Sequence, residues 1–140
     1  MQKGSQLITE QDIPNESVDL IITDPPYLEQ VLYSEYMQLY RPFLNLNYNL
    51  NDEIIVSSAP TRNKNKEDYF HLLDLVFNMC SNKLKINHYL CLYFHDCNLS
   101  VWNSLITILE KNCFRFITQI HIDKTVTLKN IINNCSLKPI

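Results

Sequence analysis

The chain is almost free of glycine, since Gly4 is the only one among its 140 residues. This absence excludes a glycine-rich turn, which is the usual way of bringing backbone N–H groups close to a phosphate or nucleotide. Long apolar runs are missing too, and none approaches the roughly 20 residues that cross a bilayer. The first residues also lack the pattern of a secretory signal peptide. We therefore expect a cytoplasmic protein.

Cysteines at metal-binding spacing are a further absence. The five cysteines form no C-x-x-C pair and have no histidine at matching spacing. Their odd number and the lack of a secretory signal favour reduced thiols over a disulfide framework. The sequence therefore predicts no metal site.

An excess of basic charge is also absent, because the formal net charge is −3 at pH 7. Nucleic-acid-binding proteins usually carry a basic stripe. The only dense basic segment here is residues 62–66, which contains Arg62, Lys64 and Lys66. Short charged runs usually form solvated loops. The alternative is a loop beside a catalytic cleft that contacts phosphates.

The chain does contain enough apolar material for a folded core. Hydrophobic residues make up 46% of it and charged residues 19%, which is typical of a globular protein rather than a disordered one. A chain of this size buries somewhat over about 60% of its unfolded surface. We expect residues 1–140 to form a single domain.

The apolar pattern alternates between the periods of strands and helices. Residues 18–23 are a short continuous apolar run, typical of a buried parallel strand. Residues 33–44 and 66–84 have helical spacing, with Pro42 breaking or kinking the first helix. Further expected elements are a short strand at 6–9, a strand at 88–94, a helix capped by Asn98 and a strand at 114–122. This order predicts an α/β fold with a mostly parallel sheet flanked by helices.

The tetrapeptide Asp24-Pro25-Pro26-Tyr27 directly follows the strand expected at residues 18–23. The prolines fix the backbone φ angle, remove two N–H donors and bias the residue before each of them toward extended geometry. A carboxylate, a rigid carbonyl and an aromatic ring then stand at the carboxyl edge of a sheet, where ligands bind in open α/β folds. Such a loop suits gripping an amino group on a planar base. Alternatively, Pro-Pro-Tyr only terminates the strand and Asp24 starts a turn.

This tetrapeptide resembles motif IV of the DNA amino-methyltransferases, which transfer a methyl group from S-adenosylmethionine to the exocyclic amine of adenine or cytosine. The resemblance runs over most of the chain. It includes residues 4–7 and 13–23 before the motif and, after it, Tyr33-Ser34-Glu35-Tyr36, Tyr93-Phe94-His95-Asp96 and Trp102. The features after the motif are similar to a subgroup of adenine-specific methylases. The resemblance therefore favours adenine N6 over cytosine N4.

The resemblance implies a partial Rossmann-like methyltransferase fold and gives roles to residues of this chain. By this resemblance, the catalytic residues of the chain are Asp24, Pro25, Pro26 and Tyr27. Asp24 and the Pro25 carbonyl would accept hydrogen bonds from the target amine and also border the cofactor S-adenosylmethionine. Tyr27 would stack on a base flipped out of the duplex. Further candidates for binding the substrate are Tyr33, Ser34, Glu35 and His95.

The resemblance covers only the catalytic half of a methyltransferase. The family's glycine-rich turn for the methionine end of the cofactor has no counterpart when Gly4 is the only glycine. The acidic residue that would hold the ribose is missing too, and the sequence after residue 122 gives no clear pattern for the family's final antiparallel strand. We interpret the chain as a fragment or one part of a split enzyme. A piece produced for expression, a permuted enzyme with its cofactor half on another chain, and an inactive relative are the alternatives. The expected partners are DNA and the segment or second chain that supplies the glycine-rich motif.

Two other functions stay open from the sequence. In the first, the chain is a non-catalytic domain that binds nucleic acid or a partner subunit. In the second, it methylates a different group, such as a protein glutamine or an RNA adenine. Nucleophilic catalysis is not expected, because neither order nor spacing supports a Ser-His-Asp or Cys-His arrangement.

Overall fold

The computed structural model describes residues 12–44 and 49–120. Its elements in chain order are β1 (Val18–Thr23), α1 (Tyr33–Leu44), the 3-10 helix η2 (Leu50–Asp52), α2 (Lys66–Lys83), β2 (Leu84–Leu92) and α3 (Leu99–Lys111). The expected strand at 6–9 lies outside the described residues. None of the described helices has the length and apolarity to span a membrane.

β1 and β2 pair in parallel, and together they form the one sheet of the described residues. Leu20 lies opposite Tyr89, and Thr23 opposite Leu92. The register shifts between Val18 and Leu20, where β2 bulges and Asn87 has a φ angle of 62°. Asparagine tolerates this left-handed region better than most residues other than glycine. The chain thus forms its bulge without glycine, and the mixed α/β class with parallel strand pairing is confirmed.

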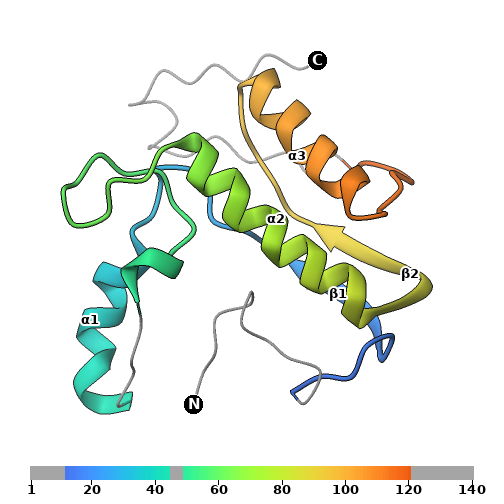
Figure 1. The fold of residues 1–140 in the computed structure, drawn as a ribbon, viewed down its shortest axis with the longest axis horizontal. Coiled ribbons are helices and arrows are strands. Elements are labelled where there is room, and N and C mark those ends of the chain that lie inside the picture. The colour runs from blue at the N-terminus through green and yellow to red at the C-terminus, as the bar shows by residue number, and fades with distance from the viewer. Residues whose placement is uncertain (1–11, 45–48, 121–140) are drawn as a thin grey trace.

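α2 and α3 cover one face of this sheet, as Figure 1 shows. α2 begins with a capping box in which Asn65 and Asp68 each accept a 2.9 Å hydrogen bond from the other's backbone N–H. The buried core cluster consists of Tyr69, Leu73 and Phe77 of α2 and Leu105 of α3. Side chains from the end of β2 pack against it, namely Leu90, Leu92 and Phe94. The helix expected over residues 66–84 is confirmed as α2, and its buried residues recur at helical spacing.

Among the described residues, no helix or strand covers the opposite face of the sheet. Leu20, Ile22 and Tyr89 are 52%, 63% and 63% exposed, although they lie at paired positions of the two strands. α1 stands apart from α2 and α3 in Figure 1, and its exposed apolar side chains include Tyr36, Leu39, Tyr40 and Phe43. Parallel sheets are usually covered on both faces, and contiguous exposed apolar surface marks an interaction site. The described residues thus present apolar surface that lacks a cover.

The boundaries correct the sequence-based prediction in two places. Residues 114–120, predicted as part of a strand at 114–122, contain no regular element, and residues 121 and 122 lie outside the described part. An alternating pattern satisfies the period of a strand, but a strand also needs a neighbouring edge to pair with. The strand predicted at 88–94 begins earlier and ends at Leu92. The helix at 33–44 is confirmed, with Pro42 inside its last turn.

Candidate functional site

The motif loop, residues Asp24, Pro25, Pro26 and Tyr27, leaves β1 at the carboxyl edge of the sheet. Beyond the last pair of the ladder, the Thr23 carbonyl accepts a hydrogen bond of 2.9 Å from the backbone N–H of Tyr93. Because the two strands are parallel, the chain leaving β2 meets the motif loop at the same edge. The structure therefore brings the loop together with the segment that contains Tyr93, Phe94 and His95.

Asp24 and Tyr27 face each other across the loop. The Tyr27 hydroxyl donates a hydrogen bond to Oδ1 of the exposed Asp24 carboxylate, and it lies 3.4 Å from the Tyr93 carbonyl oxygen. Burial, followed by the hydrogen bond to Asp24 and its charge, raises the pKa of Tyr27 to about 12. Tyr27 is thus protonated at neutral pH and acts as a hydrogen-bond donor to the carboxylate.

The Tyr27 ring belongs to a row of aromatic side chains. Its centroid lies 5.5 Å from that of Phe94 at an interplanar angle of 51°. Phe94 in turn packs edge-on against Trp102 of α3, with centroids 5.1 Å apart. The Trp102 indole N–H donates to the Asp96 carbonyl at 2.8 Å, which ties α3 to the segment after β2. The row gives Tyr27 a fixed wall on one side.

The middle of the motif loop is anchored on α2. Pro25 is buried, and the carbonyl of Pro26 accepts a hydrogen bond of 2.6 Å from the Tyr69 hydroxyl. Tyr69 is fully buried, and burial raises its pKa to about 12. A buried neutral phenol that donates to the loop backbone holds the two prolines in place. The core of α2 therefore positions the motif.

Leu28, which follows the motif loop, carries backbone strain. Its φ angle is 39°, a left-handed value that is costly for a bulky side chain. The Leu28 carbonyl accepts a hydrogen bond of 3.2 Å from the N–H of Val56, and its side chain packs against the core. Strain that surrounding contacts maintain in this way clusters at binding and catalytic sites. No sequence signal pointed to Leu28.

The other predicted site residues separate into two groups. Tyr33 is half exposed at the start of α1. His95 is exposed beyond the end of β2. Ser34 and Glu35 instead contact Glu53 and Arg62. The substrate-binding roles of all four predicted residues stay predictions.

A buried ion network surrounds the first turn of α1. Glu53 accepts hydrogen bonds from both the backbone N–H and the hydroxyl of Ser34, each at 2.8 Å. Arg62 donates to Glu53 at 3.1 Å and to the Ser34 hydroxyl at 2.8 Å, and it lies 3.5 Å from Glu35. The Arg62 and Glu53 side chains are only 7% and 10% exposed. Glu53, which comes from another segment, thus accepts hydrogen bonds at the N-terminus of α1. Arg62 balances the negative charge of Glu53.

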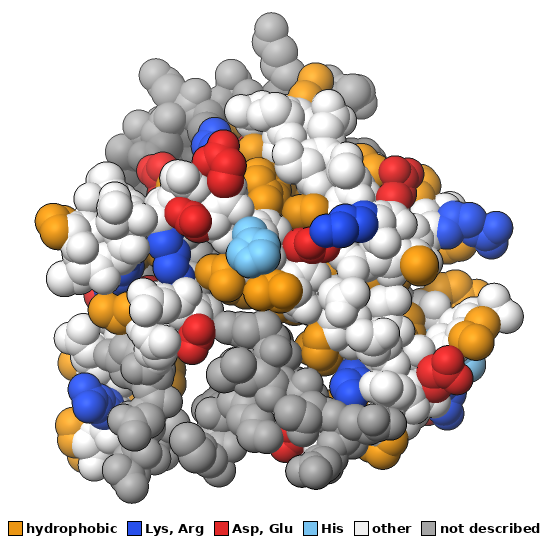
Figure 2. Space-filling view, in the orientation of Figure 1, with side chains coloured by type: hydrophobic (Ala, Val, Ile, Leu, Met, Phe, Trp, Pro, Cys, Tyr) orange, Lys and Arg blue, Asp and Glu red, His pale blue; other side chains and the backbone are white. Residues whose placement is uncertain are grey.

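Lys64 is buried as well, and its ammonium donates to the backbone carbonyls of Leu50, Asn51 and Glu53. Burial lowers the pKa of Lys64. The interpretation of residues 62–66 as a solvated loop is therefore wrong for Arg62 and Lys64, and these two cations are also committed within the fold rather than presented to phosphates. On the face that Figure 2 shows, Lys and Arg side chains are scattered among Asp and Glu.

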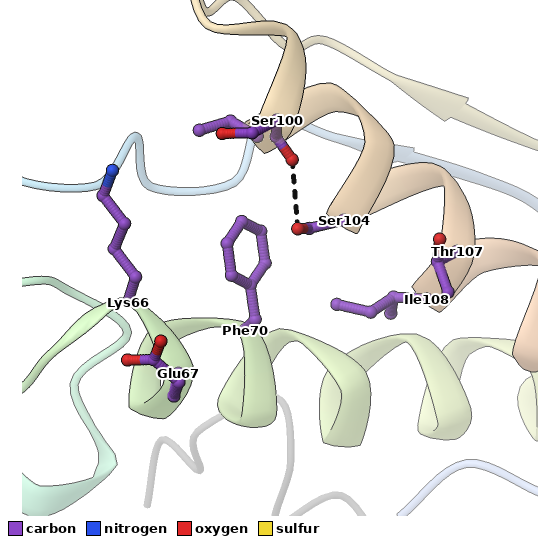
Figure 3. Close-up of a pocket in the computed structure, with 8 residues that line it drawn as sticks. Lys66, Glu67, Phe70, Ser100, Ser104, Thr107 and Ile108 are labelled. Atoms are coloured by element: carbon purple, nitrogen blue, oxygen red, sulfur yellow. Dashed lines mark hydrogen bonds between the residues drawn. The ribbon is translucent and has the colours of Figure 1, made fainter.

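An open groove of about 560 Å³ lies between α2 and α3, away from the motif loop. Figure 3 shows Phe70 and Ile108 on its walls, with three hydroxyl groups of α3 nearby. The hydroxyls of Ser104 and Thr107 donate to carbonyls one turn back in the same helix. They do not converge on a ligand, as a specific site requires. Within residues 12–44 and 49–120, no cluster of three or more His, Cys, Asp or Glu is arranged to hold a metal ion.

Comparison of the chain with family models, curated proteins and solved structures gave no match. Its functional interpretation therefore depends on the motif, its flanking residues and the geometry at the carboxyl edge of the sheet.

Proposed function

We propose that this chain forms the target-base side of a DNA amino-methyltransferase, with adenine N6 as the methyl acceptor and cytosine N4 as the alternative. The motif loop carries the proposal, because it holds the exposed Asp24 carboxylate beside the Tyr27 ring at the carboxyl edge of parallel strands. That edge is where open α/β sheets bind ligands. The sheet with α2 and α3 on one face would then be part of a Rossmann-like methyltransferase domain.

The chemistry would depend on how the loop holds the target amine. The lone pair of an exocyclic amine is delocalised into the base ring, so this nitrogen is a poor nucleophile. Asp24 and the Pro25 carbonyl would accept the two N–H groups and draw the nitrogen toward tetrahedral geometry. Asp24 would also stabilise the positive charge that develops on nitrogen. The hydrogen bond from Tyr69 to the Pro26 carbonyl anchors the loop backbone and would limit its rearrangement when the amine binds.

The target base would leave the duplex and stack on an aromatic side chain. Tyr27 is the candidate, with Phe94 as the wall behind it. Stacking of a base on an aromatic ring contributes about 1–3 kcal/mol. This amount suits a site that must hold an extruded base while the amine is aligned with Asp24.

S-adenosylmethionine would supply the methyl group, but the residues present do not form a complete site for it. Gly4, the only glycine, lies outside the described residues, and none of the described left-handed positions is a glycine. This chain would contribute Asp24 and Pro25 to the cofactor site, at the end where the methyl group is transferred. A second chain or segment would carry the glycine-rich turn. The bare face of the sheet and the exposed side of α1 support such a partner.

The same exposed surfaces favour a second candidate function, a catalytically inactive methyltransferase-like domain that binds a partner. In that case the Asp24 carboxylate would have no catalytic role and would only accept the hydrogen bond from Tyr27. The two functions differ in whether the loop recognises an amine.

Amine recognition is tested with two free bases that stack alike. We expect 9-methyladenine to perturb the nuclear magnetic resonance signals of Asp24 and Tyr27, because it offers two N–H groups to the carboxylate. The matched analogue 6-dimethylamino-9-methylpurine keeps the ring system but has no N–H donor, and we expect it to leave Asp24 unperturbed. Equal perturbation by both bases, or by neither, would contradict the proposed function.

A calorimetric titration tests the incomplete cofactor site. We expect no saturable binding when S-adenosylmethionine is titrated into this chain alone, because the turn that would hold its methionine end is missing. Tight binding would show that the chain forms the whole cofactor pocket and would refute the need for a partner.

A further inference from the structure

The sequence of the motif loop restricts every backbone angle between Asp24 and Tyr27 except those at its end. The proline rings fix the φ angles of Pro25 and Pro26. Asp24 and Pro25 each precede a proline, so their ψ angles are biased toward extended values. Pro26 precedes a tyrosine, and its ψ angle has no such restriction. This angle determines how Tyr27 is oriented relative to Asp24.

The phenol of Tyr69 acts on the backbone at this point. Its hydroxyl donates to the Pro26 carbonyl at 2.6 Å, and the direction of that carbonyl depends on the ψ angle of Pro26. Burial raises the pKa of Tyr69 to about 12, and a hydrogen bond from the Leu28 backbone opposes this rise, because a backbone N–H that donates to the phenol favours its charged form. Tyr69 therefore contacts the peptide groups on both sides of Tyr27.

The hydroxyl of Tyr69 is not needed to fill the core. The buried cluster around it consists of Leu73, Phe77 and Leu105, which are all apolar. The ring of Tyr69 continues this apolar stripe of α2, and a phenylalanine would fill the same space. Its hydroxyl is fully buried, so it needs a partner within the protein, and the motif loop supplies one. The helical pattern thus accounts for the ring, and the loop accounts for the hydroxyl.

We propose that Tyr69 is a positioning residue of the candidate site, whose hydroxyl holds the Tyr27 ring and the Asp24 carboxylate in the relative orientation that a base with an exocyclic amine requires. This inference rests on the proposed function and adds a residue that determines specificity. Such a base gains the full binding energy only if it stacks on the ring and donates to the carboxylate in the same pose. A base without an N–H donor needs only the ring.

The positioning role is tested first without any ligand, by the ¹³Cζ resonance of Tyr27. This resonance reports on the hydrogen bond that the Tyr27 hydroxyl donates to Asp24. Tyr69→Phe keeps the ring that fills the core, so we expect the chain to fold and the Tyr27 resonance to shift. Phe77→Leu disturbs the same core cluster about two turns further along α2, and we expect it to leave the resonance unchanged. An unchanged resonance in Tyr69→Phe, or equal shifts in both variants, would overturn the positioning role.

Binding of two free bases then tests the effect on specificity. We expect the wild type to bind 9-methyladenine more tightly than 6-dimethylamino-9-methylpurine, and we expect Tyr69→Phe to lower this preference about tenfold, because stacking and donation no longer coincide. Phe77→Leu should keep the preference, since a loss of core packing alone does not change how a folded site distinguishes the two bases. An unchanged preference in Tyr69→Phe would overturn the positioning role. Absence of any preference in the wild type would instead refute the proposed function, with the resonance comparison still deciding whether Tyr69 orients Tyr27.

Discussion

Asp24→Ala is expected to lower methyl transfer to DNA at least about 100-fold when this chain is assayed together with the proposed partner that carries the glycine-rich turn. A loss of this size is typical of removing one preorganised group that stabilises transition-state charge. The physical reason is that alanine offers the amine no acceptor and leaves the developing positive charge on nitrogen without a partner. The measurement is the transfer of a labelled methyl group from S-adenosylmethionine to duplex DNA.

The matched control for this prediction is Asp19→Ala in β1, the strand that leads into the motif loop. Asp19 is an exposed carboxylate that pairs with Lys85 at 2.6 Å at the other end of β1. Its removal changes net charge as Asp24→Ala does, so we expect the control to keep nearly full activity. Retained activity in Asp24→Ala would remove Asp24 from the mechanism, and equal losses in both variants would point to a general charge effect.

Arg62→Met is expected to lower the free energy of unfolding by about 3–5 kcal/mol, because it leaves the nearly buried Glu53 carboxylate without its counter-charge. This is a large fraction of the roughly 5–15 kcal/mol by which domains are stable. Arg62 also donates to Ser34 at the start of α1, so the loss should loosen that helix. Urea unfolding followed by circular dichroism measures the effect.

Two further variants separate this structural role from phosphate contact. Lys66→Met removes an exposed charge from the same basic segment, and we expect it to change stability by no more than about 0.5 kcal/mol. The double variant Glu53→Gln with Arg62→Met removes both charges, and it should recover part of the lost stability. If Arg62→Met weakened DNA binding at unchanged stability, the phosphate interpretation of residues 62–66 would be correct instead.

Elements with strong local signals were predicted well. The stripe of Tyr69, Leu73 and Phe77 places α2 on the core, because helical periodicity fixes which side chains share a face. The proline pair ends β1 where expected, since proline acts on its own φ angle and on the residue before it. The co-location of the motif loop with the segment after β2 follows from parallel pairing alone.

The pattern of α1 predicted a helix but not its surroundings. Tyr36, Tyr40 and Phe43 lie on one side of the helix by spacing, yet they are 61%, 56% and 84% exposed. An amphipathic stripe indicates that a helix has an apolar side, and it does not specify what covers that side. The same limit explains residues 114–120, where alternation suggested a strand and Phe116 is 73% exposed.

The sequence by itself determined the elements whose causes lie within a few neighbouring residues, namely β1 with its proline stop and α2 with its capping box. Only the tertiary structure decided which hydrogen-bond partners the charged and phenolic groups around the motif loop have. Arg62 finds Ser34 across 28 residues, and Tyr69 reaches the Pro26 carbonyl across 43. Such contacts depend on which segments meet after folding and on which polar atoms burial leaves in need of a partner. The position of the Tyr27 hydroxyl on Asp24 follows from the same cause, since the fixed wall of Phe94 and the anchored loop determine where the ring can lie.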